Sequence, residues 1–532
     1  MSLGRLGLAS GKLGVLAPPV PGWVPRGYGF QQGIFAQPKF NRIWIAGQGI
    51  RYYDALNSSG VSQGGAIANT RASTEYLVDA NGNWTSVGNL INARNGLGHN
   101  VYEGRTDLFS YSTRVDVAKT LTVTGNSGGW VDGEVVTSNA GGNGALYIAD
   151  LSTGGTLVLG GNIIGNYANT NVVTGSTSGA TATISVASST FRAPNEITVK
   201  GAGSVASPGL GGIGQAILET SNNAEHRLRE QIAVATNSTY TWSAIVKPNG
   251  RTVTRLRVLS SPTVANGILA DFTLSGSGSI SNLAAIGAAT GAAATIQSYA
   301  NGWYLVTLTG NVAPASGDTS AIFDIYSMAT AGTPSFTGDP TKGLYVALLQ
   351  SELGGSATPP ISTQLNSVAR AADVCSMTLP AALQAKMAAA GASLWFDGTL
   401  QVPSTYANQC TALTLSNGTN QERVILGGAG GSQVGFGTVT IGGVGTSAST
   451  GVTWTQNTEK KLAVAVNTSG RIASILTGGS VVTGAPGSPN FSLMNTLNVM
   501  CNQSGAAQYN GLGASWGLAP IAWSDAQLAS LV

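Results

Sequence analysis

Tyr240-Thr-Trp-Ser-Ala-Ile-Val-Lys247 is the stretch that decides the fold class, because aromatic and β-branched residues fill it and turn residues follow it. Two later runs share this character, Trp303-Tyr-Leu-Val-Thr-Leu-Thr309 and Leu344-Tyr-Val-Ala-Leu-Leu349. Such runs are typical of antiparallel strands in a β-sandwich. They predict a jelly-roll sandwich in which Trp242 and Trp303 belong to the core.

The composition around these runs supports an all-β chain. The 532 residues include 74 glycines, and only 9% are charged, which leaves little material for long surface helices. The hydrophobic fraction of 42% argues against disorder. We therefore expect a multidomain chain of antiparallel β-sandwiches.

The net charge, the cysteines and the histidines argue against several kinds of partner and binding site. The net charge of +3 and the lack of Lys/Arg runs predict no nucleic-acid partner. Cys375, Cys410 and Cys501 are too widely spaced for a CxxC site and are expected to be buried free thiols, while His99 and His226 lie far apart in sequence. We expect no metal and no cofactor. No apolar run is long enough for a membrane span, so we expect no membrane insertion.

A second sandwich is expected after residue 375, where strand-like runs such as Lys461-Leu-Ala-Val-Ala-Val466 recur. Pro380 and Gly391 frame a predicted short helix with the usual Pro-first, Gly-last pattern. Ser524 is a candidate cap for a closing helical turn that packs back on the sheet.

Residues 117–188 carry a faint internal repeat, since Val135-Val136-Thr137-Ser138 is echoed by Val172-Val173-Thr174-Gly175. This pattern predicts a small two-fold β module. Residues 1–100 are interrupted by Gly, Asn and Pro and hold only short apolar pieces. We expect a coil-rich segment there that needs a partner surface.

Two short phrases interrupt this weakly charged chain, Glu103-Gly-Arg-Thr-Asp-Leu108 and Ala369-Arg-Ala-Ala-Asp-Val374. An Arg and a nearby Asp can hold the start of a strand through side-chain hydrogen bonds. We therefore expect a structural seam between domains at each phrase, formed by Arg105 with Asp107 and by Arg370 with Asp373.

The first of these phrases belongs to a longer stretch of sequence that resembles a known group of proteins. The stretch Arg71-Ala-Ser-Thr-Glu-Tyr-Leu-Val-Asp-Ala-Asn-Gly-Asn-Trp84, followed by Arg105-Thr-Asp-Leu108 and Tyr111-Ser112, resembles the N-terminal part of a group of bacteriophage tail and virion-surface proteins. In that group the second phrase reads R-T-N-L and leads into a carbohydrate-binding-like jelly roll. Asp107 stands here where Asn is usual.

The last 160 or so residues are similar to a laminin-G or concanavalin-like sandwich through Lys460-Lys-Leu-Ala-Val-Ala465 and Trp523-Ser-Asp-Ala-Gln-Leu528. The two resemblances imply a phage particle component. The expected domains are a virion-attachment segment at 1–100, a jelly roll at 101–116 and 189–374, an inserted β module at 117–188, and a laminin-G/concanavalin-like sandwich at 375–532.

The resemblance implies a virion protein of the tail (fibre, spike or tail tip) that recognises host surface polysaccharide or lipopolysaccharide. It implies attachment to other virion proteins through residues 1–70. Deleting these residues should therefore release the protein from particles and leave the sandwiches folded. We expect no enzymatic activity, and a homo-oligomer with a trimer favoured. The alternatives are a non-binding adaptor or head decoration protein and, ranked last, a polysaccharide depolymerase.

Candidate contact residues follow from the chemistry of sugars, whose apolar faces stack on aromatic rings. Tyr406, Trp454 and Trp516 lie near turn-like sequence in the C-terminal sandwich and are the glycan-contact candidates. Packing in the core is the competing interpretation for each of them. We identify no catalytic residue.

Overall fold

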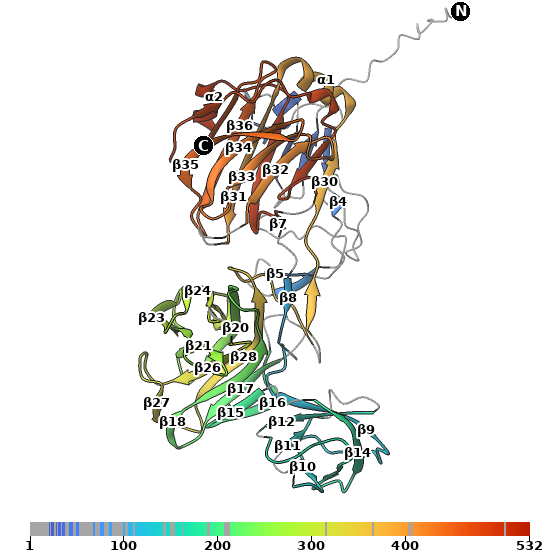
Figure 1. The fold of residues 1–532 in the computed structure, drawn as a ribbon, viewed down its shortest axis with the longest axis vertical. Helices are drawn as coiled ribbons and strands as arrows, with labels where there is room; N and C mark the ends of the chain where they lie inside the picture. Colours follow the sequence, from blue (N-terminus) through green and yellow to red (C-terminus); the bar gives the residue numbers. More distant parts are fainter. Residues whose placement is uncertain are drawn as a thin grey trace, which may run out of the picture.

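The computed structural model is built almost entirely of antiparallel β-sheets, which confirms the expected class of several β-sandwiches (Figure 1). It describes residues 105–532 apart from gaps at 110–111, 142–144, 149–154, 162, 189–191, 207–212, 314–316, 364–366, 403–405, 407 and 505–506. Before residue 105 it describes pieces of 21–52, and 68–69, 75–78, 84–87 and 99–101. Residues 1–20 and much of the Arg71 phrase lie outside the described residues. None of the described helices is long and apolar enough to cross a membrane.

The jelly roll consists of two six-stranded sheets that pack around a common core. Trp242 is fully buried in that core, and Trp303 is buried in a smaller cluster with Ile245 and Leu348, as the sequence predicted. The first sheet runs β15 (Arg192–Asn195), β19 (Arg227–Ala233), β26 (Ser320–Met328), β21 (Val253–Ser261), β22 (Gly267–Thr273) and β23 (Ser279–Ile286). The second runs β16 (Ile197–Ala206), β17 (Ile213–Glu219), β28 (Gly343–Leu353), β20 (Tyr240–Asn249), β25 (Tyr304–Asn311) and β24 (Thr290–Ser298). Short pieces flank them, β18 (Asn223–Glu225) paired with β27 (Ser335–Thr337), and η4 (Ala300–Gly302).

Six strands between the first seam and the jelly roll close into a small barrel. The two copies of the sequence repeat are neighbouring strands, and Thr137 is the register partner of Thr174. The repeat is therefore a structural pair inside one barrel. In order around the barrel the strands are β10 (Val135–Ser138), β11 (Ala145–Tyr147), β12 (Thr156–Gly160), β9 (Val117–Thr124), β14 (Thr181–Ala187) and β13 (Val172–Gly175).

Glu134 joins two turns of this barrel. Its carboxylate accepts hydrogen bonds from the backbone N–H groups of Val131 (2.7 Å), Thr177 (3.0 Å) and Ser178 (2.9 Å), and from the Ser178 hydroxyl (2.8 Å). Burial alone would raise the pKa of Glu134, but these hydrogen bonds lower it to about 2. Each bond is strongest to the ionised carboxylate.

We expect Glu134→Gln to destabilise the barrel by about 1.5–3 kcal/mol near pH 7, the range for hydrogen bonds to a charged group. Because the folded pKa lies below the unfolded value, the ionised group stabilises the fold fully above about pH 4.5. This stabilisation is lost as the pH falls toward 2. Hydrogen exchange of barrel peptides in the full chain, followed against pH, measures both effects.

Asp132→Asn is the control, since it removes an exposed acid from the same turn. It should leave barrel exchange unchanged. Equal acid sensitivity of the barrel in wild type and Glu134→Gln would contradict the assigned role of Glu134.

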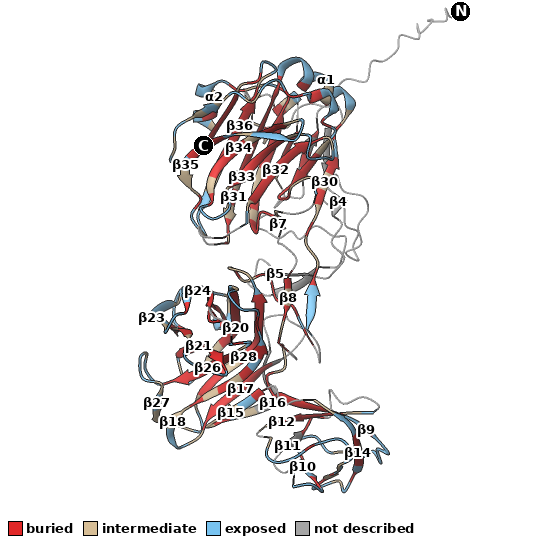
Figure 2. Cartoon of the chain, viewed as in Figure 1, coloured by how far each residue is buried: buried red, intermediate tan, exposed pale blue. Residues whose placement is uncertain are grey.

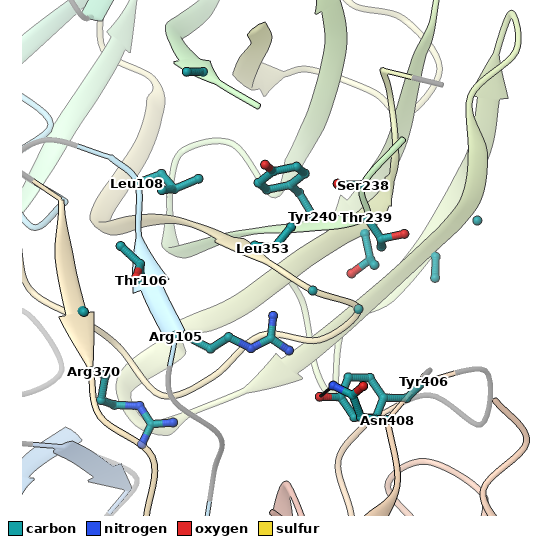
Figure 3. A pocket seen from close by; sticks show the side chains of 17 residues that line it. Arg105, Thr106, Leu108, Ser238, Thr239, Tyr240, Leu353, Arg370, Tyr406 and Asn408 are labelled. Carbon is teal, nitrogen blue, oxygen red and sulfur yellow. Dashed lines mark hydrogen bonds between the residues drawn. The ribbon is translucent and has the colours of Figure 1, made fainter. Parts of the chain in front are cut away.

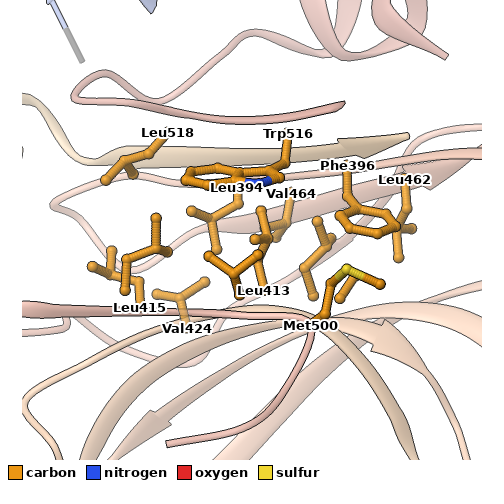
Figure 4. Close-up of a cluster of buried hydrophobic side chains, with 14 of the residues drawn as sticks. Leu394, Phe396, Leu413, Leu415, Val424, Leu462, Val464, Met500, Trp516 and Leu518 are labelled. Carbon is orange, nitrogen blue, oxygen red and sulfur yellow. The ribbon is translucent and has the colours of Figure 1, made fainter. Parts of the chain in front are cut away.

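The C-terminal sandwich has two sheets around the largest core of the described chain. Leu394, Phe396 and Trp516 of one sheet face Leu413 and other apolar side chains across the core (Figure 4). The buried residues run along the strands of both sheets (Figure 2). One sheet runs β3 (Gly49–Tyr52), β2 (Arg42–Ile45), β1 (Ile34–Gln37), β40 (Gly511–Ala519), β31 (Ala392–Leu400), β36 (Glu459–Val466), β37 (Ile472–Leu476) and β38 (Val482–Gly484), with β7 (His99–Val101) also beside β40. The other runs β35 (Val444–Thr453), β34 (Val434–Ile441), β33 (Glu422–Gly428), β32 (Cys410–Ser416), β39 (Thr496–Val499), β30 (Cys375–Thr378) and β4 (Ala68–Asn69).

Short helices complete this sandwich. Helix α1 (Ala381–Ala390) follows Pro380 and ends at Gly391, where φ is +82°. Helix α2 (Asp525–Leu531) begins at a capping box between Ser524 and Gln527 and buries Leu528. Both helices lie where the sequence predicted them. The remaining elements are η1 (Phe30–Gln32), η5 (Phe491–Leu493), and β5 (Glu75–Val78) paired with β6 (Trp84–Val87).

The N-terminal strands belong to the C-terminal sandwich, which differs from the separate segment expected at 1–100. Strand β1 pairs with β40, with Ile34 opposite Leu518. Phe30 and Phe35 pack on Trp523 and Trp395. The short apolar pieces within residues 1–100 thus join a hydrophobic core that is formed mainly by the C-terminal part of the chain. Deleting residues 1–70 would remove β1, so we now expect this deletion to destabilise the C-terminal sandwich.

The chain therefore leaves the C-terminal sandwich after β7 and returns to it at β30. The jelly roll is inserted between these strands, and the barrel is inserted before the jelly-roll sheets begin. Such insertions are tolerated when the two ends of the inserted domain lie close together. The two seams meet this condition, because they pair with each other.

Candidate functional site

A cleft of about 1070 Å³ lies where the jelly roll, the two seams and the C-terminal sandwich meet (Figure 3). The seams contribute Arg105 and Arg370, the jelly roll contributes Tyr240 and Leu353 among others, and the loop before β32 contributes Tyr406 and Asn408. Leu353 is 54% exposed and forms an apolar rim. This is the candidate functional site.

The two seams form a two-stranded ribbon, which we call the seam ribbon, of β8 (Arg105–Asp107) and β29 (Val368–Arg370). Arg105 is the direct register partner of Arg370, and Thr106 is that of Ala369. The ribbon places both arginines at the cleft.

Arg105 extends from β8 toward the part of the cleft where Tyr406 and Asn408 lie (Figure 3). A methyl group built on Gly354 would be 1.5 Å from Nη1 of Arg105, and one on Gly355 would be 3.6 Å from the Tyr406 ring. Gly354 also has φ +124°. The guanidinium therefore packs directly on the backbone at Gly354, a position that only glycine can occupy in this arrangement. Asn408 donates a hydrogen bond to the Tyr406 hydroxyl at 3.2 Å.

Asp107 holds the seam ribbon to the jelly roll from a fully buried position. Its Oδ1 accepts hydrogen bonds from the backbone N–H groups of Phe109 (3.1 Å) and Ser351 (3.0 Å). Its Oδ2 has no hydrogen-bond partner among the described residues. Burial raises the pKa of Asp107 well above its ordinary value, although these two backbone hydrogen bonds oppose the rise.

We expect Asp107→Asn to stabilise the chain at pH 7 by about 1–3 kcal/mol, because the amide keeps the oxygen acceptor and removes a carboxyl whose raised folded pKa costs stability at any pH above its unfolded pKa. The raised folded pKa means that wild type is most stable below the unfolded value of about 3.9 and loses stability as the pH rises through the folded pKa. The advantage of the Asn variant should therefore shrink toward pH 4. Denaturant unfolding of both chains between pH 4 and 8 measures the difference.

Glu459→Gln makes the same carboxylate-to-amide change at an exposed position. Its stability should differ little from that of wild type at every pH between 4 and 8. A lower stability of Asp107→Asn at pH 7 would show that the buried carboxylate is required.

Arg370 and Asp373 are both buried at the second seam, 3% and 0% exposed. The contact between Nη1 of Arg370 and Oδ2 of Asp373 is 3.5 Å long. The backbone carbonyl of Asp373 accepts a hydrogen bond from Gln508 of the C-terminal sandwich at 3.3 Å. This seam is thus held to the sandwich that the chain enters next.

The aromatic candidates divide into one cleft residue and two core residues. Tyr406 lines the cleft, although it is only 5% exposed. Trp454 and Trp516 are fully buried in the C-terminal core. Trp516 occupies an inward position of β40 opposite Phe396, and Trp454 packs its ring on Tyr509. Their burial corrects the prediction that they contact a glycan.

The sequence reasoning missed Tyr240, Leu353 and Asn408 as cleft residues, and it treated Arg105 and Arg370 as structural only. A signal was present for the arginines, because both phrases place an Arg in a chain that has few charges. Tyr240, Leu353 and Asn408 could not be found in this way, because they are far apart in the sequence and come together only in the folded chain.

The three cysteines are buried free thiols, as expected. Burial raises the pKa of Cys501 to about 12, which keeps this thiol protonated. None of the cysteines is among the residues that line the cleft.

No protein-family model matches the chain, and no curated protein matches it. Among solved structures, the chain is similar to the mouse laminin alpha1 chain, domains LG4-5, at 9% identity and a TM-score of 0.18. The match covers 57% of this chain and 89% of that one. A likeness of this size carries no argument about function, and the assignment of β-sandwiches depends on the sheets described above.

Proposed function

We propose that this chain is a bacteriophage virion protein of the tail, a fibre, spike or tail-tip component, that recognises a host surface glycan in the cleft. The observation that carries the proposal is the set of groups that converge there. Apolar, aromatic, amide, hydroxyl and guanidinium groups come from the jelly roll, the seam ribbon and the C-terminal sandwich. Sugars present apolar C–H faces and hydroxyl rims, and such a mixture binds both.

The position of the cleft supports the proposal. Rigid sandwiches hold binding residues in the loops at their ends, and Thr239 and Asn408 are exposed loop residues of two different sandwiches. The phage assignment is supported by the order of the sequence phrases described above. We propose attachment to other virion proteins through those parts of residues 1–70 that do not pair with the C-terminal sandwich, and a homotrimer, which light scattering of the full chain measures.

The test uses the labelled full chain on an array of purified bacterial surface polysaccharides. Asn408→Ala and Thr239→Ala should each weaken binding several-fold, while Thr483→Ala, an exposed Thr on β38, should not. Binding that is unaffected by either cleft variant would show that the glycan site lies outside the cleft. Binding to no polysaccharide would favour the adaptor or decoration role, and release of new reducing ends would favour the depolymerase. Imaging of antibody-labelled particles distinguishes tail from head.

A further inference from the structure

His226 is a fully buried histidine at the junction of β18 and β19, and both of its ring nitrogens face backbone carbonyl groups. Nδ1 lies 2.6 Å from the carbonyl oxygen of Glu196, and Nε2 lies 3.1 Å from that of Phe336. A carbonyl oxygen can only accept a hydrogen bond, and a neutral imidazole has a single N–H donor. Both contacts are therefore hydrogen bonds only when the ring carries both protons.

The two contacts join separate segments of the jelly roll. Glu196 lies between β15 and β16, whereas Phe336 belongs to β27, which pairs with β18. We call the pair of β18 and β27 the end ribbon, because it lies at the end of the jelly roll that points away from the C-terminal sandwich (Figure 1). The backbone N–H of Ser327 on β26 donates to the carbonyl of His226 at 2.9 Å. The histidine is thus fixed to the body of the jelly roll and holds the end ribbon through Nε2.

The imidazole ring is tightly enclosed. A methyl group built on Gly338 would lie 2.5 Å from Cε1 of His226 and 2.7 Å from Nε2. The Phe336 ring centroid lies 4.7 Å from that of the imidazole. In this position a ring that loses one proton directs a lone pair at a carbonyl oxygen, and a buried polar group without its hydrogen bond is costly.

A carboxylate beside the ring favours its positively charged form. The carboxylate of Glu196 accepts hydrogen bonds from the Thr220 hydroxyl at 2.5 Å and from the Asn222 amide at 2.7 Å. These hydrogen bonds lower the pKa of Glu196, and the charge of His226 lowers it further. An ionised carboxylate near a buried imidazolium offsets part of the cost of burying that charge.

The other charged groups around His226 largely neutralise one another. Three bases on the neighbouring segments each form an ion pair with an acid, at 2.5 to 3.0 Å. The hydroxyl of Tyr326, on β26, lies 3.3 Å from the carboxylate of the first of these acids. The three pairs are Arg227 with Glu225, Arg251 with Glu219, and Lys342 with Asp339. Glu196 is therefore the acid that remains to face the imidazolium.

We propose that His226 is a pH-sensitive latch that holds the end ribbon to the jelly roll when its ring carries both protons. When the ring gives up one proton, the longer contact, from Nε2 to Phe336, is lost and the ribbon opens more often. Histidine ordinarily changes its charge between pH 5 and 8, so the latch strengthens toward the acidic end of this range and weakens toward the basic end. The inference is independent of the proposed function, since no residue of the end ribbon lines the cleft.

Hydrogen exchange of the full chain at pH 5.5 and pH 8, with labelling times scaled for the intrinsic exchange rate, tests the latch. We expect peptides that cover β18 and β27 to exchange about tenfold faster at pH 8 after this correction, the effect of one lost hydrogen bond to a charged group. Peptides of β25 should show no such change. Equal corrected exchange of the end ribbon at both pH values, or the same change in β25, overturns the inference.

Variants assign the effect to this histidine. In His226→Gln the end ribbon should exchange as fast at pH 5.5 as it does in wild type at pH 8, with no further change as the pH rises. His99→Gln removes the other histidine of the chain and should keep the pH dependence. A pH dependence that survives in folded His226→Gln, or that is lost in His99→Gln, overturns the role of His226.

A direct measurement of the ring decides the inference even where His226→Gln fails to fold. In the His99→Gln chain, labelled with ¹³C at the histidine Cε1, the remaining histidine gives a single NMR signal whose position reports its protonation. We expect the signal of the doubly protonated ring at pH 5.5 and a movement toward the neutral position as the pH rises. The signal of a neutral ring throughout the range from pH 5.5 to 8 overturns the latch.

Discussion

Phe30→Ala will lower the free energy of unfolding of the C-terminal sandwich by about 3–5 kcal/mol, the range for removing a fully buried aromatic ring. Phe30 is 0% exposed and lies 5.1 Å from the Phe35 ring and 5.4 Å from the Trp523 ring. A methyl group on Gly517 of β40 would lie 2.3 Å from it, so the ring fills its site closely. Denaturant unfolding of the full chain, with hydrogen exchange of β40 peptides, measures the loss.

Gln32→Ala is the matched control, because Gln32 is an exposed residue of the same short helix. It should leave β40 exchange unchanged. Exchange in β40 that is equally slow in Phe30→Ala and wild type would mean that the N-terminal residues do not form part of this sandwich. A truncation that removes residues 1–52 should have a larger effect, since it also leaves the edge of β40 unpaired.

Local chemistry explains which parts of the fold could be predicted. The runs at Tyr240 and Lys461 are strands, and the helix bounded by Pro380 and Gly391 forms, because propensity and capping act within a few residues. The pairing of Ile34 with Leu518 joins opposite ends of the chain. Nothing in a short strand specifies so distant a partner, so the N-terminal strands could not be assigned to their sheet.

The candidate site, like the fold, could be predicted only in part. The two Arg/Asp phrases could be recognised as seams because charge is rare in this chain, but their mutual pairing and their place at a cleft depend on tertiary structure. Turn-like sequence near Trp454 suggested an exposed ring. Which face of a sandwich an aromatic residue occupies is decided by the strands that pack over it, and local sequence does not show this.

Trp454→Ala will destabilise the C-terminal sandwich by about 3–5 kcal/mol while leaving the polysaccharide affinity of the folded protein unchanged. Trp454 is 0% exposed, its ring centroid is 5.3 Å from that of Tyr509, and its indole N–H donates to the carbonyl of Thr458 at 3.2 Å. A residue that contacts glycan would show the reverse, with weaker binding and little change in stability, as expected for Asn408→Ala. Denaturant unfolding and array binding, measured on both variants, separate the two roles. Lost affinity in a Trp454→Ala protein of unchanged stability would place the glycan site in the C-terminal sandwich, and retained affinity in a destabilised one would leave it at the cleft.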